Sequence, residues 1–299
     1  MRPSHKSATS FVLWLPSFAF LVIAYSTVFS QSTAAPSPTP TATTAKSFFA
    51  NILKDQKGLW SSPFHLQQRD AKWIAPIGLS MAALLATDTR TSSELVENGD
   101  NRSRLRMSKD ISYTGSLYSL GGVAATFYLT GRMRHDERAK ETGLLAAEAL
   151  LDSTIISQAL KGVSGRQRPR FDNGTGEFLD GGSSFPSGHA INSWAVATVI
   201  AQEYGPAHPA VPYVVYGLAT AIGISRYTGR KHFLSDVLAG GALGYGIGRY
   251  VYHQHHDPTL DGETEKQTSR LFGSKFFPSI ASDFRPRARS YGARVAWSF

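Results

Sequence analysis

Apolar residues recur at helical spacing along most of the chain between residues 71 and 253. A spacing of three to four positions places apolar side chains on one face of a helix. We expect helices over Ala71–Ala86, Lys109–Met133, Asp136–Lys161, Gly188–Glu203, Val211–Tyr227 and His232–His253. Alternation typical of strands is scarce before the C-terminus. The predicted fold is therefore all-α, a helical bundle of about six core helices.

Two of the expected helices contain long uncharged runs. Ile111–Gly131 has no charged residue across 21 positions, and Ala210–Ser225 has none across 16. Both runs are rich in Gly, Ala, Ser and Thr, which permits close helix packing. They could cross a bilayer or lie buried in a soluble bundle. The mean hydropathy of −0.18 favours a soluble or peripherally attached bundle.

The N-terminal 46 residues are predicted to lie outside the bundle. Residues 1–30 have a positively charged start followed by the uncharged apolar stretch Phe11–Ser30, the pattern of a signal peptide. Cleavage is expected after Ser30 or Ala34, and an uncleaved N-terminal anchor is the alternative. Residues 31–46 form a Pro/Ser/Thr linker. We therefore expect an exported protein that is periplasmic or membrane-associated.

Composition is consistent with one helical domain over residues 47–256. The chain has 299 residues, of which 42% are hydrophobic, enough for a substantial core. There is no cysteine, which excludes disulfides, thiol chemistry and cysteine-ligated metals. The net charge of +9 is uneven, because residues 270–299 hold six Lys and Arg residues against Asp283 alone. The basic C-terminal tail, residues 257–299, is either solvated or bound to an anionic surface. Alternation over Tyr291–Phe299 predicts an edge strand or docking tail.

Lys161 and Arg168-Pro169 form the first of three clusters that point to a chemistry. Pro169 cannot continue a helix and favours extended backbone at Arg168, so Lys161 lies near a helix end and Arg168 in the next loop. An arginine fork can bind two phosphate oxygens, and a lysine adds a point charge. The alternative is that both cations only complement a helix dipole. The flanking Arg166 and Arg170 are predicted to be surface charges.

Pro186-Ser187-Gly188-His189 is the second cluster, and it predicts a helix start with Ser187 as N-cap. The free N–H groups at such a start bind anions, and Gly188 allows close approach of the backbone. His189 in the first turn could donate a proton beside the anion. A serine-capped helix with a solvated histidine is the alternative.

Ser225-Arg226, His232 and Asp236 form the third cluster. His232 and Asp236 are four positions apart, so on a helix they would share a face. Asp236 would then accept a hydrogen bond from one imidazole nitrogen and leave the other as a nucleophile. Arg226 adds a second guanidinium. An ordinary pair on a helix surface is the alternative for His232 and Asp236.

Together, these clusters closely resemble the motifs of the type 2 phosphatidic acid phosphatase family, which shares its site with vanadium haloperoxidases and bacterial class A acid phosphatases. The resemblance covers about residues 70–255. It implies that His232 attacks phosphorus and becomes a phosphohistidine, that Asp236 orients it, and that His189 protonates the leaving alcohol and then activates water. It also implies phosphate contacts from Lys161, Arg168, Ser187, Gly188 and Arg226.

The expected activity is metal-independent hydrolysis of a phosphomonoester, either a lipid phosphate or pyrophosphate or a soluble ester, at an active site formed by helix ends. No cofactor is expected, and vanadate would act as a phosphate mimic. One alternative is a vanadate-dependent haloperoxidase with vanadate as its cofactor. Another is a non-enzymatic envelope protein that binds phosphate.

The expected partner is a phosphorylated small molecule or lipid and not a nucleic acid, with membrane association left open. The sequence specifies no oligomeric state. His253, His255 and His256 are interpreted as a polar helix end, not as metal ligands.

Overall fold

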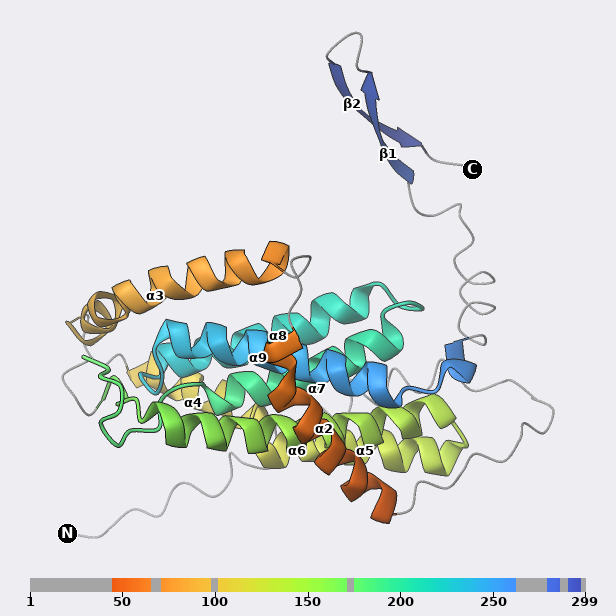
Figure 1. The fold of residues 1–299 in the computed structure, drawn as a ribbon, viewed down its shortest axis with the longest axis horizontal. Coiled ribbons are helices and arrows are strands. Elements are labelled where there is room, and N and C mark those ends of the chain that lie inside the picture. The colour runs from red at the N-terminus through yellow and green to blue at the C-terminus, as the bar shows by residue number, and fades with distance from the viewer. Residues whose placement is uncertain are drawn as a thin grey trace.

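The computed structural model describes residues 45–65, 71–97, 102–170, 175–261, 279–285 and 290–296. The expected signal peptide and nearly all of the linker lie outside these residues. So do most of the basic tail and the side chains of its two described strands. Figure 1 shows the arrangement of the helices. They are α2 (Ala45–Ser61), α3 (Ala71–Glu97), α4 (Arg102–Thr114), α5 (Leu117–Arg134), α6 (Glu137–Ser164), α7 (Gly188–Tyr204), α8 (Ala210–Thr228) and α9 (Leu234–His255), with 3-10 turns η1 (Ser62–His65) and η3 (Pro258–Leu260).

The all-α prediction for the body is confirmed, with three differences in its elements. The helix expected over Lys109–Met133 is divided into α4 and α5, because the Ser116 side chain caps α5 by accepting from the Ser119 N–H at 3.2 Å. Helix α2 was not predicted. Helix α9 begins at Leu234, so His232 precedes this helix and does not share a helical face with Asp236.

A glycine stripe on α9 brings this helix close to α7. Gly240, Gly244 and Gly248 recur every fourth residue and lie on one face. A Cβ on Gly244 would lie 2.2 Å from the carbonyl oxygen of Ile191, and one on Gly248 would lie 2.4 Å from that of Ala195. The two backbones therefore meet almost directly, which fixes the start of α7 against the start of α9.

The hydrophobic core lies between α5, α6, α7 and α9, where residues such as Ala149, Ile191 and Val251 are fully buried or nearly so. Among the described residues, only α6 is long and apolar enough to cross a membrane, and 56% of that stretch is buried inside the bundle. This degree of burial is what a core helix of the bundle also shows.

Helix α3 lies along one side of the bundle (Figure 1). Its N-terminal half is exposed, including Ile74, Ile77 and Leu79. Its C-terminal half carries the buried Asp88, which is 1% exposed and points toward α9. This half of α3 brings an acidic side chain to the site described below.

A two-stranded antiparallel hairpin follows later in the chain. Strand β1 (Ser279–Arg285) pairs with β2 (Ser290–Ala296), from Ser279 opposite Ala296 to Arg285 opposite Ser290. The alternation from Tyr291 onward thus predicted β2 correctly as far as Ala296. Its partner β1 carries no comparable alternation and was missed.

Candidate active site

The end of α6, the start of α7 and the start of α9 meet at one end of the bundle. Helix α6 stops at Gly165, whose φ of 53° is the left-handed conformation favoured by glycine. The loop that follows returns to α7, where the Ser187 N–H donates to the Asp236 carbonyl at 3.0 Å. Each of the three sequence clusters lies at or near one of these helix ends, so the fold brings the clusters together.

Ser187, Gly188 and Lys161 form a cradle at the start of α7. Ser187 occupies the N-cap position as predicted, but its side chain makes no capping hydrogen bond. Its hydroxyl is buried and has no partner among the described residues. A Cβ on Gly188 would lie 3.0 Å from Lys161 Nζ, so the ammonium sits directly over the helix start. Free N–H groups, an unpartnered hydroxyl and a cation are what a tetrahedral oxyanion requires.

Arg168 and Arg226 add two guanidinium groups to this cradle. Arg168 donates to Ser183 Oγ at 3.2 Å. The Nε atoms of Arg168 and Arg226 are buried and have no hydrogen-bond partner among the residues that the structure describes. No carboxylate forms an ion pair with either arginine within the described part of the chain. Burial, together with the nearby Arg168, lowers the pKa of Arg226 to about 10. The site therefore holds positive charge that a bound anion would compensate.

His232 is held with one ring nitrogen free. Its Nδ1 lies 2.7 Å from the Ser184 carbonyl, which can only accept, so Nδ1 carries the proton and Nε2 keeps a lone pair. Asp236 Oδ2 is farther away, at 3.6 Å from Nδ1. The tautomer is thus set by a backbone carbonyl, with Asp236 as a charged neighbour, whereas the sequence had assigned the hydrogen bond to Asp236.

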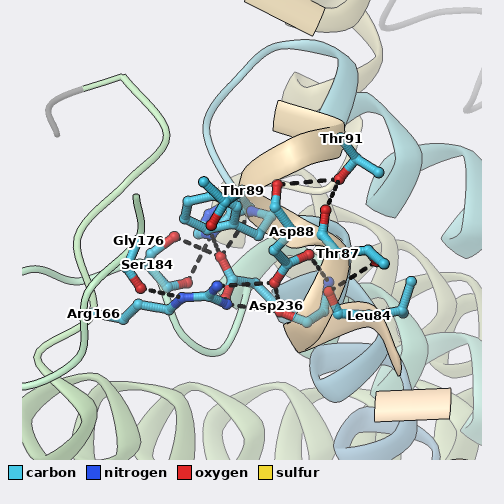
Figure 2. Close-up of polar contacts among 12 residues, drawn as sticks. Leu84, Thr87, Asp88, Thr89, Thr91, Arg166, Gly176, Ser184 and Asp236 are labelled. Carbon is cyan, nitrogen blue, oxygen red and sulfur yellow. Dashed lines mark hydrogen bonds and ion pairs between the residues drawn. The ribbon is translucent and has the colours of Figure 1, made fainter. Parts of the chain in front are cut away.

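Asp236 belongs to a buried ion network that centres on Arg166 (Figure 2). Arg166 Nη1 donates to Asp236 Oδ1 at 2.7 Å, and Nη2 donates to Asp88 Oδ2 at 2.9 Å. The Ser184 hydroxyl and the Phe233 N–H donate to Asp236 Oδ2 at 2.5 and 2.9 Å. Burial alone would raise the pKa of Asp236, yet its partners, chiefly His232 and Arg166, hold it below the usual range.

The prediction that Arg166 is a surface charge is wrong. Its side chain is 2% exposed and lies between two rings, 4.1 Å from the Phe233 centroid and 4.8 Å from that of Phe178. Its Nε donates to the Gly176 carbonyl at 3.1 Å. A buried arginine is stabilised only when its donors are satisfied. Asp88 on α3 and Asp236 on α9 provide the carboxylates, so this ion network connects α3 to the junction where the three clusters meet.

His189 lies in the first turn of α7 among the cations. Burial lowers its pKa to about 3, helped by Arg226, His232, Lys161 and Arg168. Burial likewise lowers the pKa of His232 to about 4, against the opposing effect of Asp236. Both histidines are therefore neutral in the ligand-free site at neutral pH.

All eight candidate residues from the sequence meet at this junction. The sequence reasoning missed three further contributors: Arg166, the Ser184 carbonyl and hydroxyl, and Asp88. Arg166 lies between the members of the first cluster, and Ser184 lies two positions before the second cluster, so closeness in the sequence could have indicated both residues. Asp88 lies 78 positions before Arg166 and carries no local signal.

One protein-family model, described as the PAP2 superfamily, matches residues 142–260, a stretch that contains all three clusters. Residues 142–260 are a PAP2 superfamily domain. The PAP2 domain begins within α6 and ends after α9, so α2, α3 and Asp88 precede it. The resemblance inferred from the motifs is confirmed.

Two curated relatives and one solved structure illustrate the similarity. Lipid A 1-phosphatase of Porphyromonas gingivalis is 40% identical over 70 residues, which cover 23% of this chain and 16% of that protein. Phosphatidylglycerophosphatase B of Bacillus subtilis is 34% identical over 109 residues, 34% of this chain and 52% of that protein. A crystal structure of a transmembrane PAP2 type phosphatidylglycerolphosphate phosphatase from Bacillus subtilis covers 74% of this chain and 96% of that one, with 21% identity and a TM-score of 0.43.

The chain spans between 16% and 59% of the length of the curated relatives that it matches.

Proposed function

We propose that the protein is a phosphatase that hydrolyses phosphomonoesters through a phosphohistidine on His232, without a catalytic metal or other cofactor. One observation carries this proposal. Two guanidinium groups without a carboxylate partner among the described residues, an ammonium and a hydroxyl likewise without a partner form a cradle. This cradle lies next to a histidine whose Nε2 lone pair is free. Phosphoryl transfer depends chiefly on positioning and charge stabilisation, and this site offers both.

In the first step, the Nε2 lone pair of His232 attacks phosphorus and the bond from phosphorus to the ester oxygen breaks. His189, which is neutral before the substrate binds, relays the proton of the monoanionic phosphate to that oxygen, so the alcohol leaves neutral. Lys161, Arg168 and Arg226 hold the non-bridging oxygens, and Ser187 Oγ and the Gly188 N–H complete the cradle. Asp236 stabilises the positive charge on the phosphorylated ring, an arrangement supported by its proximity to Nδ1.

In the second step, His189 is neutral and takes a proton from water as the water attacks the phosphohistidine. The N–P bond breaks and its electrons return to Nε2. Inorganic phosphate takes the proton back from His189 and leaves as the monoanion, so both histidines return to their neutral forms. A covalent intermediate divides one difficult displacement into two easier ones. The ammonium and guanidinium groups supply the charge that a metal ion would otherwise provide, so the reaction requires no metal.

A phosphorylated lipid is the substrate class that we favour over a soluble ester. The two relatives described above are named as lipid A and phosphatidylglycerophosphate phosphatases. Exposed apolar side chains on α3 and on the start of α5, including Leu79, Leu117 and Tyr118, would suit contact with acyl chains or a membrane surface. Export to the periplasm or its membrane is part of the same proposal, and it rests on the N-terminal pattern.

A phosphate-release panel tests the proposal. The purified protein should release phosphate from an aryl phosphate after EDTA treatment, with vanadate inhibiting at low concentration. Lipid phosphates in mixed micelles should be hydrolysed faster than soluble monoesters. His232→Ala should reduce release by at least about 10³-fold, while His253→Ala, at an exposed position on α9, is the matched control. Activity retained by His232→Ala, or indifference to vanadate, would contradict the assignment.

A further inference from the structure

A second polar cluster lies at the far end of α9, where the sequence had suggested only a polar helix end. His255 is the last residue of α9, about 33 Å along the helix from its start. Its Nε2 lies 2.8 Å from Asp55 Oδ2 of α2. Glu148 of α6 offers a further ligand atom, and one such atom from each of the three residues lies within 4.8 Å of the others. Asp152, one turn along α6, lies next to them.

The carboxylates of this cluster are buried and incompletely bonded. Asp55 and Asp152 are fully buried, and Glu148 is 3% exposed. Each has one oxygen without a hydrogen-bond partner in the part of the chain that the structure describes: Asp55 Oδ1, Glu148 Oε2 and Asp152 Oδ2. Glu148 and Asp152 accept instead from neutral amides, with Asn51 donating to Glu148 at 3.1 Å and Gln56 donating to Asp152 at 2.8 Å. A buried carboxylate oxygen with no donor is costly unless a cation fills the gap.

A neighbouring cluster provides the contrast. Glu141, Glu203 and His256 also lie close together. There, however, Arg138 lies 3.9 Å from Glu203 and supplies a permanent positive charge. In the cluster of Asp55, Glu148 and His255, by contrast, His255 is the only cationic group that forms an ion pair with a carboxylate among the residues that the structure describes. Among the described residues, the cluster of Asp55, Glu148 and His255 is therefore the one without a permanently charged partner.

We propose that Asp55, Glu148 and His255, supported by Asp152, bind a divalent cation, with Zn²⁺ as the best match. One imidazole with carboxylates is a donor set for Zn²⁺ or a similar transition metal, whereas Mg²⁺ and Ca²⁺ prefer oxygen ligands alone. The ligand atoms of one tetrahedral Zn²⁺ lie about 3.4 Å apart. Small side-chain movements would therefore bring the ligand atoms of this cluster, which lie within 4.8 Å of one another, to coordinating distances. The proton shared by His255 Nε2 and Asp55 Oδ2 is released to solvent as the metal binds.

The metal would clamp α2 to the bundle. Figure 1 shows α2 running obliquely across the other helices. Much of its surface is exposed, including Phe49 and Leu53. Asn51, Gln56 and Asp55 form side-chain hydrogen bonds to α6 and α9. A cation held by all three helices would replace a weak polar contact with coordinate bonds. Its role is structural, so it is independent of the phosphatase reaction.

Calorimetric titration of the EDTA-stripped full chain with ZnCl₂ tests this proposal. We expect one Zn²⁺ per chain, a rise of about 5 °C or more in the melting midpoint at saturating Zn²⁺, and no comparable effect of MgCl₂. Glu148→Gln should weaken Zn²⁺ binding at least about 10-fold. Glu141→Gln in the neighbouring cluster is the matched control and should leave binding unchanged, as should His253→Ala. Zn²⁺ binding that survives Glu148→Gln, or that is lost in Glu141→Gln, would overturn the assignment.

Hydrogen exchange on the wild-type protein gives a second readout that does not depend on a variant folding. Zn²⁺ should slow amide exchange across Ala45–Ser61 about 10-fold. Unchanged exchange there would overturn the clamp. Phosphate release below the melting transition should persist in EDTA whether or not Zn²⁺ binds, which separates failure of this proposal from failure of the proposed reaction.

Discussion

The backbone carbonyl of Ser184 determines which nitrogen of His232 is free to react. The sequence suggested that Asp236 does this, because a His–Asp pair four residues apart is a familiar helical arrangement. His232 instead precedes α9, and its ring turns toward a loop 48 residues upstream. Residue types and spacing could predict the members of the site, but not which backbone atom the fold would bring to an imidazole.

The lowered pKa values of the two histidines predict an acidic pH optimum. Above about pH 4 both are neutral, because their folded pKa values are about 3 for His189 and about 4 for His232. His232 can therefore attack, but His189 has no proton to give. A monoanionic phosphomonoester must bring that proton. We predict that kcat/KM falls as pH rises through the second pKa of the substrate phosphate, about 6.

The measurement is the pH profile of kcat/KM for two alkyl phosphates whose second pKa values differ by about one unit. The descending limb should move with the substrate. A limb that stays at the same pH for both substrates would assign the titration to the enzyme and contradict this account.

Apolar periodicity predicted α6, α7, α8 and α9 to within a few residues, because their caps coincide with clear signals such as Gly165 and Pro186-Ser187. Helix α2 was missed because it follows directly from a Pro/Ser/Thr linker. Arg166 was misplaced because arginine is usually exposed. Its burial depends on Asp88, 78 residues away on a helix whose packing the sequence does not show.

The glycine stripe on α9 gives a prediction at the scale of elements. Gly244→Ala would place a Cβ 2.2 Å from the Ile191 carbonyl and force α7 away from α9. We expect a loss of about 1–3 kcal/mol in the free energy of unfolding, measured by urea titration. Gly246→Ala, where a Cβ meets nothing within 4 Å, is the control and should gain up to about 1 kcal/mol. Equal effects at the two positions would contradict close packing through the stripe.

At the scale of the whole molecule, the candidate active site stands out as a region of uncompensated positive charge. Such sites sacrifice stability for function. Arg226→Met should therefore raise the free energy of unfolding by about 1 kcal/mol, since it removes a half-buried cation near Arg168. The same variant should weaken vanadate binding at least about 10-fold. Arg249→Met, at an exposed position on α9, should do neither. An Arg226→Met variant that is less stable and still binds vanadate normally would contradict this electrostatic account.

The central claim is that His232 carries the phosphoryl group, and phosphoenzyme trapping tests it most directly. In His189→Ala, an aryl phosphate with a good leaving group can still phosphorylate His232, but water activation is lost, so the intermediate should accumulate. After quenching in base, peptide mass spectrometry should locate one phosphoryl group on His232. A phosphoryl group on another residue, or continued phosphate release with no phosphoenzyme, would contradict the account.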